Sequence, residues 1–89
     1  QLESSDDTPD VLVERSEMRE FINKAINSLS DEHRMVIVLR DIQGFSYEEI
    51  AEIIDCPEGT VKSRINRARK ALREIFKSTM ELTEQESVK

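Results

Sequence analysis

The stretch SYEEIAEIIDCPEGTVKSRINRARKALREIF, residues 46–76, predicts two helices separated by a short break. Ser46 and Glu49 have the S-x-x-E spacing of a capping box, in which each side chain accepts a hydrogen bond from a backbone N–H at the helix start. Apolar residues follow at Ile50, Ala51, Ile53 and Ile54. The first helix is therefore expected over residues 46–54, and Pro57 suits the opening of the second. Two helices joined by about three or four residues have the geometry of a helix-turn-helix.

The second helix of this pair is expected to run from Pro57 to about residue 78. Its apolar side chains fall on one face: Val61, Ile65, Ala68, Leu72, Ile75 and Phe76. With 3.6 residues per turn, Ser63, Arg67 and Lys70 point away from that face. The outward side of the helix is thus polar and basic.

Charge is distributed unevenly along the chain. Residues 59–80 carry seven Lys or Arg and one acid, a net charge of +6. Residues 1–58 carry five bases and fifteen acids, or −10, and residues 81–89 carry −2, which gives −6 for the whole chain. An acidic body repels polyanions except at its one basic helix, so this pattern predicts an oriented approach to DNA. The major groove of B-DNA admits an α-helix.

Residues on the outward face have two expected roles. Those with donors suited to base edges are Lys62, Asn66 and Arg67. Those placed to straddle the phosphates are Arg64, Arg69 and Arg73. At the start of the helix, Gly59 and Thr60 leave room for a phosphate backbone to approach free amides. The sequence therefore predicts a DNA-binding surface on this helix.

Two further helices are predicted upstream. Pro9 suits the first position of a helix over residues 9–28, and Ser30 suits the cap of a helix over residues 31–43 that Gly44 ends. The run RMVIVLRDI in the second of these also has strand character, but the sequence offers no other strand to pair with it. One core is expected from Phe21, Ile26, Leu39, Ile50, Ile54, Val61, Ile65 and Leu72.

Composition supports an all-α, four-helix domain that contains a helix-turn-helix. The 89 residues are 37% hydrophobic and include only two Gly and two Pro. The expected organisation is an acidic linker (1–7), the helical domain (8–78) and a polar tail (79–89). Because the chain begins at Gln1, we expect it to be a piece of a longer protein.

Several classes of function are not expected. No run approaches the roughly 20 apolar residues of a membrane span, so a soluble protein is expected. The single cysteine, Cys56, cannot form an internal disulfide and fits a reducing cytoplasm. The acids Glu48, Glu49 and Glu52 have no His, Lys or metal ligand placed to help them, so neither an enzyme nor a metal or cofactor site is expected.

The segment GFSYEEIAEIIDCPEGTVKSRINRARKALRE resembles region four, the promoter-binding C-terminal domain, of bacterial RNA polymerase sigma factors. The likeness is to the extracytoplasmic-function (ECF) group. LSDEHRMVIVLRDIQGFSYEEIAEI is similar to the helices that precede its helix-turn-helix, and DTPDVLVERSEMREFINKAI to its opening helix. The resemblance covers about residues 8–77 and implies the winged-helix-like, all-α fold class of these domains.

The resemblance also implies a function: a promoter specificity module that reads the minus-35 element. The positions implied to face the bases are Lys62, Ser63, Asn66 and Arg67. The positions implied to meet the DNA backbone are Arg40, Ser46, Tyr47, Thr60, Arg64 and Arg69, to which the outward-facing Lys70 and the flanking Arg73 are added. The implied partners are promoter DNA, the flap of the β subunit of RNA polymerase core, and an anti-sigma protein.

The flap is expected to bind apolar side chains of the first three helices. Candidates are Met35, Val36, Ile37 and Phe45, which alternatively belong to the core. Two other functions remain open for the whole chain. One is the helix-turn-helix output domain of a response regulator, and the other is a module whose basic helix binds an acidic partner, chiefly an anti-sigma protein.

Overall fold

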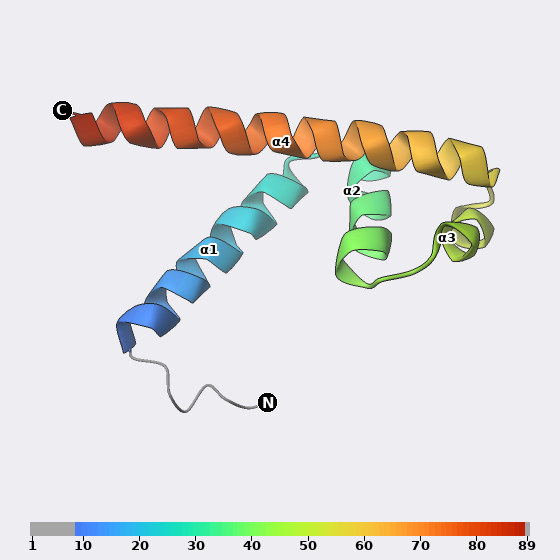
Figure 1. Ribbon diagram of the computed structural model, residues 1–89, viewed down its shortest axis with the longest axis horizontal. Helices are drawn as coiled ribbons and strands as arrows, with labels where there is room; N and C mark the ends of the chain where they lie inside the picture. Colours follow the sequence, from blue (N-terminus) through green and yellow to red (C-terminus); the bar gives the residue numbers. More distant parts are fainter. Residues whose placement is uncertain (1–8, 89) are drawn as a thin grey trace.

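The computed structural model describes residues 9–88, and every regular element in that range is helical. The elements are α1 (Pro9–Asn27), α2 (Asp31–Ile37), the π-helical turn η2 (Val38–Ile42), α3 (Tyr47–Ile54) and α4 (Glu58–Val88). The long helix α4 forms a rod, and the other elements lie along one side of it (Figure 1). The all-α, four-helix prediction is confirmed, whereas the expected linker at residues 1–7 lies outside the described residues.

The predicted helix boundaries hold to within one or two residues except at the end of α4. The expected end near residue 78 is wrong, because α4 continues to Val88. Residues 79–88 are polar and acidic, which suggested a tail, but they contain neither Gly nor Pro. Nothing in this segment interrupts the backbone hydrogen bonds of a helix, so α4 propagates through it.

The second predicted helix, residues 31–43, divides into α2 and η2. The Gln43 N–H donates to the Val38 carbonyl at 2.9 Å, the i→i+5 bond of a π-helix. Gly44 then adopts a left-handed backbone with φ of 80°, and the Phe45 N–H donates back to the Leu39 carbonyl at 2.9 Å. A residue without a Cβ tolerates this conformation best, so Gly44 ends the helix as expected.

The core lies where α1, α2 and α3 meet the first half of α4. Its buried members are Ile26, Leu29, Val36, Ile37, Ile50, Val61, Ile65 and Ala68. Half-buried residues of the predicted core, Leu39, Ile54 and Leu72, pack against them. Phe21 is outside this cluster and stacks instead on Phe76 of α4.

Two residues considered for partner binding belong to the core. Val36 and Ile37 are 0% and 1% exposed, because the face of α2 that carries them packs against α4. Phe45 is half-buried against the same core, and only Met35 of this group is exposed. Of the two possibilities for Val36 and Ile37, the structure therefore supports membership of the core.

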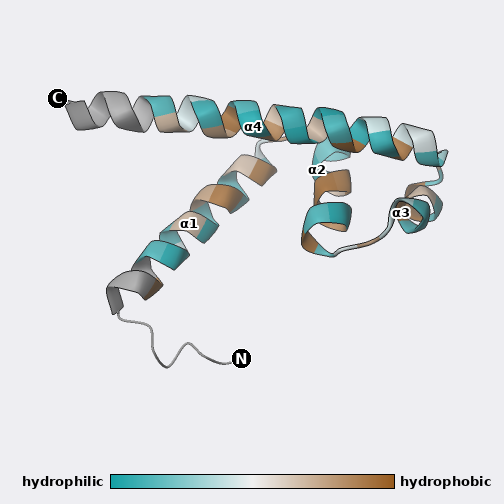
Figure 2. Ribbon diagram, in the orientation of Figure 1, coloured by the Kyte–Doolittle hydropathy of each residue, from teal (hydrophilic) through white to brown (hydrophobic). Residues whose placement is uncertain are grey.

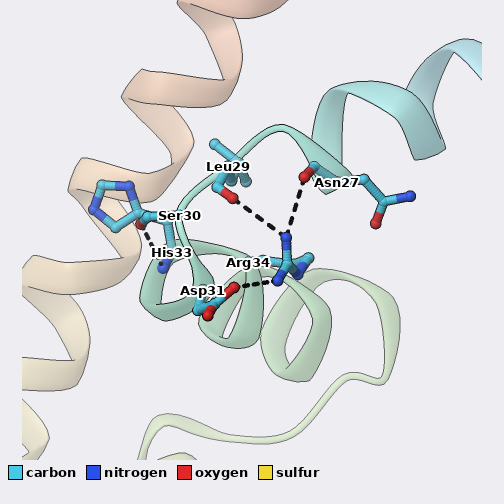
Figure 3. A network of polar contacts seen from close by, with 6 residues as sticks. All are labelled: Asn27, Leu29, Ser30, Asp31, His33 and Arg34. Atoms are coloured by element: carbon cyan, nitrogen blue, oxygen red, sulfur yellow. Dashed lines mark hydrogen bonds and ion pairs between the residues drawn. The ribbon is translucent and has the colours of Figure 1, made fainter.

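A polar junction fixes the angle between α1 and α2 (Figure 3). Arg34 of α2 donates from Nη1 to the carbonyls of Asn27 and Leu29, at 3.1 and 3.3 Å, and from Nη2 to Asp31. The Asn27 carbonyl lies at the negative end of α1, where a cation is favourable. Ser30 caps α2 by accepting a hydrogen bond from the His33 N–H.

Candidate nucleic-acid interface

The helix-turn-helix begins with the capping box predicted at Ser46 and Glu49. Ser46 Oγ accepts from the Glu49 N–H at 3.0 Å, and Glu49 Oε1 accepts from the Ser46 N–H at 2.8 Å. Both bonds satisfy donors that a helix start otherwise leaves free. With its first turn fixed, α3 buries Ile50 completely in the core.

Three residues, 55–57, connect α3 to α4. Asp55 adopts a left-handed conformation with φ of 56° and ψ of 54°, which a short polar side chain tolerates better than most. The Cys56 N–H donates to the Ala51 carbonyl at 3.0 Å, and the half-buried Cys56 packs against the core. The Pro57 carbonyl accepts the first helical bond of α4, from Val61, at 3.1 Å. The break is therefore tight and internally bonded.

The first half of α4 has one buried and one exposed face. Val61, Ile65 and Ala68 are each 0% exposed and hold the helix on the core. The residues predicted to read bases are all exposed: Lys62, Ser63, Asn66 and Arg67. Of the residues predicted to meet phosphates on α4, Lys70 and Arg73 are exposed, while Thr60, Arg64 and Arg69 are half-buried at its edges. The sequence periodicity identified this face correctly.

The exposed side chains differ in how firmly they are held. Lys62 Nζ lies 3.9 Å from Glu58 Oε2 and 5.8 Å from the centroid of the Tyr47 ring. Ser63 Oγ donates to the Thr60 carbonyl at 3.2 Å. Within residues 9–88, Asn66 and Arg67 make no side-chain hydrogen bond or ion pair, so their donors are available to a ligand.

Two more residues predicted to contact the DNA backbone, Arg40 and Tyr47, lie in η2 and at the start of α3. Arg40 of η2 donates from Nη1 to the Phe45 carbonyl at 2.8 Å, and its guanidinium lies 4.7 Å from the centroid of the Tyr47 ring. The Tyr47 ring is therefore close to both Arg40 and Lys62, which come from different elements. The stacked geometry restricts Arg40 to the surface at the start of α3.

An ion pair that the sequence did not predict links η2 to α4. Arg69 donates from Nε to Asp41 Oδ2 at 3.1 Å and from Nη2 to Asp41 Oδ1 at 2.5 Å. The hydrogen bond that Arg69 donates to Asp41 is the main cause that raises the pKa of Arg69 above its ordinary value. The partners are 28 residues apart, so no local pattern could have revealed the pair.

The start of α4 leaves space for a close ligand. A Cβ built on Gly59 would have no atom within 4 Å, so the protein itself does not require a glycine at this position. The backbone of this turn carries amides that have no partner further back along the helix. Such amides bind anions, including the phosphates of DNA.

Comparison with known proteins agrees with this geometry. Residues 20–72 match the sequence model of the family described as Sigma-70, region 4. The chain is 52% identical to the "ECF RNA polymerase sigma-E factor" of Escherichia coli K12 over 64 residues, which are 72% of this chain and 34% of that protein. It is 46% identical to the protein of the same name from Haemophilus influenzae over 66 residues, 74% of this chain and 35% of that protein. The chain thus spans about a third of the length of these relatives.

Within residues 9–88, none of the helices combines the length and apolar character that crossing a membrane requires.

Proposed function

The chain belongs to the Sigma-70 region 4 family, and on this premise we propose how its helix-turn-helix acts on a promoter. Region 4 of ECF sigma factors is a helix-turn-helix domain that binds the minus-35 element. The match to the Sigma-70 region 4 family favours a sigma-factor domain over the output domain of a response regulator. In the proposed complex, the N-terminal half of α4 enters the major groove, and the longer protein directs RNA polymerase core to that promoter in the cytoplasm.

One observation carries the proposed mode of binding. Lys62, Ser63, Asn66 and Arg67 are all exposed on α4 opposite the fully buried Val61, Ile65 and Ala68. Arginine, lysine and asparagine are suited to the donor and acceptor pattern of the major groove, and Asn66 and Arg67 have no competing partner among the described residues. These four side chains are proposed to read bases.

Phosphate contacts are proposed on both sides of this face. The proposed set is Arg40, Ser46, Tyr47, Thr60, Arg64, Lys70 and Arg73. Arg40 lies in η2 and Tyr47 at the start of α3, whereas Lys70 and Arg73 lie further along α4, so the set brackets the base-reading residues. Contacts to phosphates fix the register and carry no sequence information.

Selection of duplexes from a random pool by the 89-residue chain tests the proposal. We expect one enriched motif, with an affinity that falls steeply as salt rises. Asn66→Ala should change the motif at one position, whereas Asn23→Ala, which alters an exposed asparagine on α1, should leave it unchanged. A selected pool without a motif, or equal binding to selected and scrambled duplexes, would contradict base readout by α4.

The proposed site for RNA polymerase is the apolar groove between α1 and the second half of α4. It has a volume of about 820 Å³, and its lining consists of two acids and five apolar residues: Glu14, Glu17, Met18, Phe21, Ile22, Phe76 and Met80. The helices diverge from the core outward (Figure 1), and hydrophobic residues of both are visible in Figure 2. We assign this groove to a helix of the β flap. An anti-sigma protein that occupies the same groove would prevent binding of the flap.

Two exposed methionines give a matched test of this assignment. Met18 lies in the groove and is 57% exposed, while Met35 lies on α2 and is 53% exposed. Titration with a synthetic peptide of the flap-tip helix should show that Met18→Glu weakens binding at least about tenfold, because a buried charge is costly. Met35→Glu should have little effect. The reverse result would move the site to α2, and no binding by the wild-type chain would leave only the DNA function.

A further inference from the structure

The ion pair between Asp41 and Arg69 joins the two surfaces proposed to contact DNA. Asp41 belongs to η2, and Arg69 lies on α4, two residues beyond Arg67, the last of the base-reading residues. Both oxygens of the carboxylate accept hydrogen bonds from the guanidinium, at 3.1 and 2.5 Å. A bidentate pair of this kind fixes orientation as well as distance.

This pairing makes Arg69 a poor phosphate ligand. The two side chains are similarly accessible, at 37% and 36% exposed, so a phosphate that reached Arg69 would also meet the carboxylate of Asp41. Like charges at such short range repel, and the pair as a whole presents no net positive charge to DNA. The geometry suits a fixed link between elements better than a free cation.

The ion pair between Asp41 and Arg69 is connected, through Arg40, to the start of α3. The residue before Asp41 is Arg40, which donates to the Phe45 carbonyl at 2.8 Å and stacks on Tyr47. Ser46 and Tyr47, both proposed to meet phosphates, follow directly. Asp41, and to a smaller extent Tyr47, raise the pKa of the Arg69 guanidinium. Asp41 and Arg69 therefore connect the start of α3 to the middle of α4.

We propose that Asp41 is a positioning residue for DNA recognition: through Arg69 it holds the phosphate-facing start of α3 in register with the base-reading face of α4. This inference rests on the proposed DNA function. It assigns Arg69 a role different from the direct phosphate contact that the sequence suggested. The two roles predict effects of opposite sign when Asp41 is removed.

The test is a double-mutant cycle on DNA affinity, using the 89-residue chain and a duplex that the wild-type chain selects from a random pool. Asp41→Ala and Arg69→Ala should each weaken binding by about fivefold, and the double variant should bind no more weakly than either one. Arg69→Lys should also lose affinity, because an ammonium cannot form the bidentate pair. If Arg69 instead contacted a phosphate directly, Asp41→Ala would tighten binding and Arg69→Lys would retain most of it.

Glu48→Ala is the matched control, since it removes one exposed acid from the first turn of α3 without touching the pair. It should leave affinity unchanged or raise it slightly. If Asp41→Ala behaves like Glu48→Ala, the positioning role is wrong. If circular dichroism shows that either single variant is partly unfolded, the charge-swapped double variant Asp41→Arg with Arg69→Asp is used instead. Restored DNA affinity of this variant would support the link. Affinity no better than that of the single variants would overturn it. A wild-type chain that does not distinguish selected from scrambled duplexes would instead contradict the DNA function.

Discussion

Phe21 of α1 and Phe76 of α4 stack with their ring centroids 5.4 Å apart and their planes inclined by 24°. Both rings are half-buried and lie outside the main core cluster. This contact joins α1 to α4 beyond the point where the core ends. It also forms part of the wall of the groove assigned to the polymerase flap.

Removing one ring should destabilise the domain. Phe76→Ala loses the stacking contact and apolar burial, and we expect the free energy of unfolding to fall by about 2 kcal/mol. Met80→Ala is the control on the same helix, because Met80 is 61% exposed and should change stability by less than about 0.5 kcal/mol. Urea unfolding followed by circular dichroism measures both. Equal effects of the two substitutions would show that the stack contributes nothing.

The left-handed turn after η2 predicts a requirement for glycine at residue 44. Gly44 has φ of 80°, and a Cβ there would meet no atom within 4 Å. The cost of Gly44→Ala is therefore conformational and should be about 1–2 kcal/mol of unfolding free energy. Gly44→Asn should cost less than Gly44→Ala, since asparagine visits this region more readily. If both variants were as stable as the wild type, the turn would not be left-handed in solution.

The junction in Figure 3 predicts an asymmetric effect of its two charged residues. Arg34→Met removes two hydrogen bonds to carbonyls at the end of α1 and should lower the free energy of unfolding by about 1–2 kcal/mol. Asp31→Ala removes only the exposed partner, whose side chain is 94% exposed, and should cost less than about 1 kcal/mol. Thermal unfolding of the two variants compares them directly. A larger loss for Asp31→Ala would mean that the ion pair, and not the carbonyl contacts, holds α1 to α2.

Substitution of Gly59 should change the stability of the domain and its affinity for DNA in opposite directions. Because a Cβ at residue 59 meets open space in the helix, Gly59→Ala should raise the free energy of unfolding by up to about 1 kcal/mol. If a phosphate backbone approaches this turn, the same methyl group should weaken binding to selected and scrambled duplexes alike. Fluorescence anisotropy on both duplexes measures the effect. Unchanged affinity would place the phosphate elsewhere.

Local signals explain which parts of the fold could be predicted from the sequence. The capping box at Ser46 and Glu49 involves residues three apart, and the buried stripe of Val61, Ile65 and Ala68 repeats with the period of a helix. Both features are fixed by neighbours along the chain. The helix-turn-helix and the exposed face of α4 could therefore be predicted from the sequence.

Features that depend on residues far apart in the sequence could not be predicted from it. In the continuous apolar run from residue 35 to 39, periodicity alone does not determine which side chains face α4, and therefore does not predict the burial of Val36 and Ile37. The pairing of Asp41 with Arg69 follows from the placement of η2 against α4 and has no local signature. A polar composition does not by itself end a helix, and residues 79–88 contain no residue that stops one, so composition predicts too short an α4.

The exposed face of α4 is proposed to read bases, and substitution of Arg67 gives the sharpest test of that role. Arg67 is exposed and has no competing hydrogen bond or ion pair among the described residues, and a bidentate contact to guanine is the commonest specific use of such a side chain. Arg73, exposed further along the same helix, is the matched control that is proposed to contact a phosphate.

The measurement is the affinity of wild type, Arg67→Ala and Arg73→Ala for the selected and the scrambled duplex at several salt concentrations. Arg67→Ala should lose about 1–3 kcal/mol on the selected duplex and little on the scrambled one. Arg73→Ala should weaken both duplexes and lower the salt slope by about one unit. Base readout by this face would be contradicted if Arg67→Ala lost affinity equally for both duplexes.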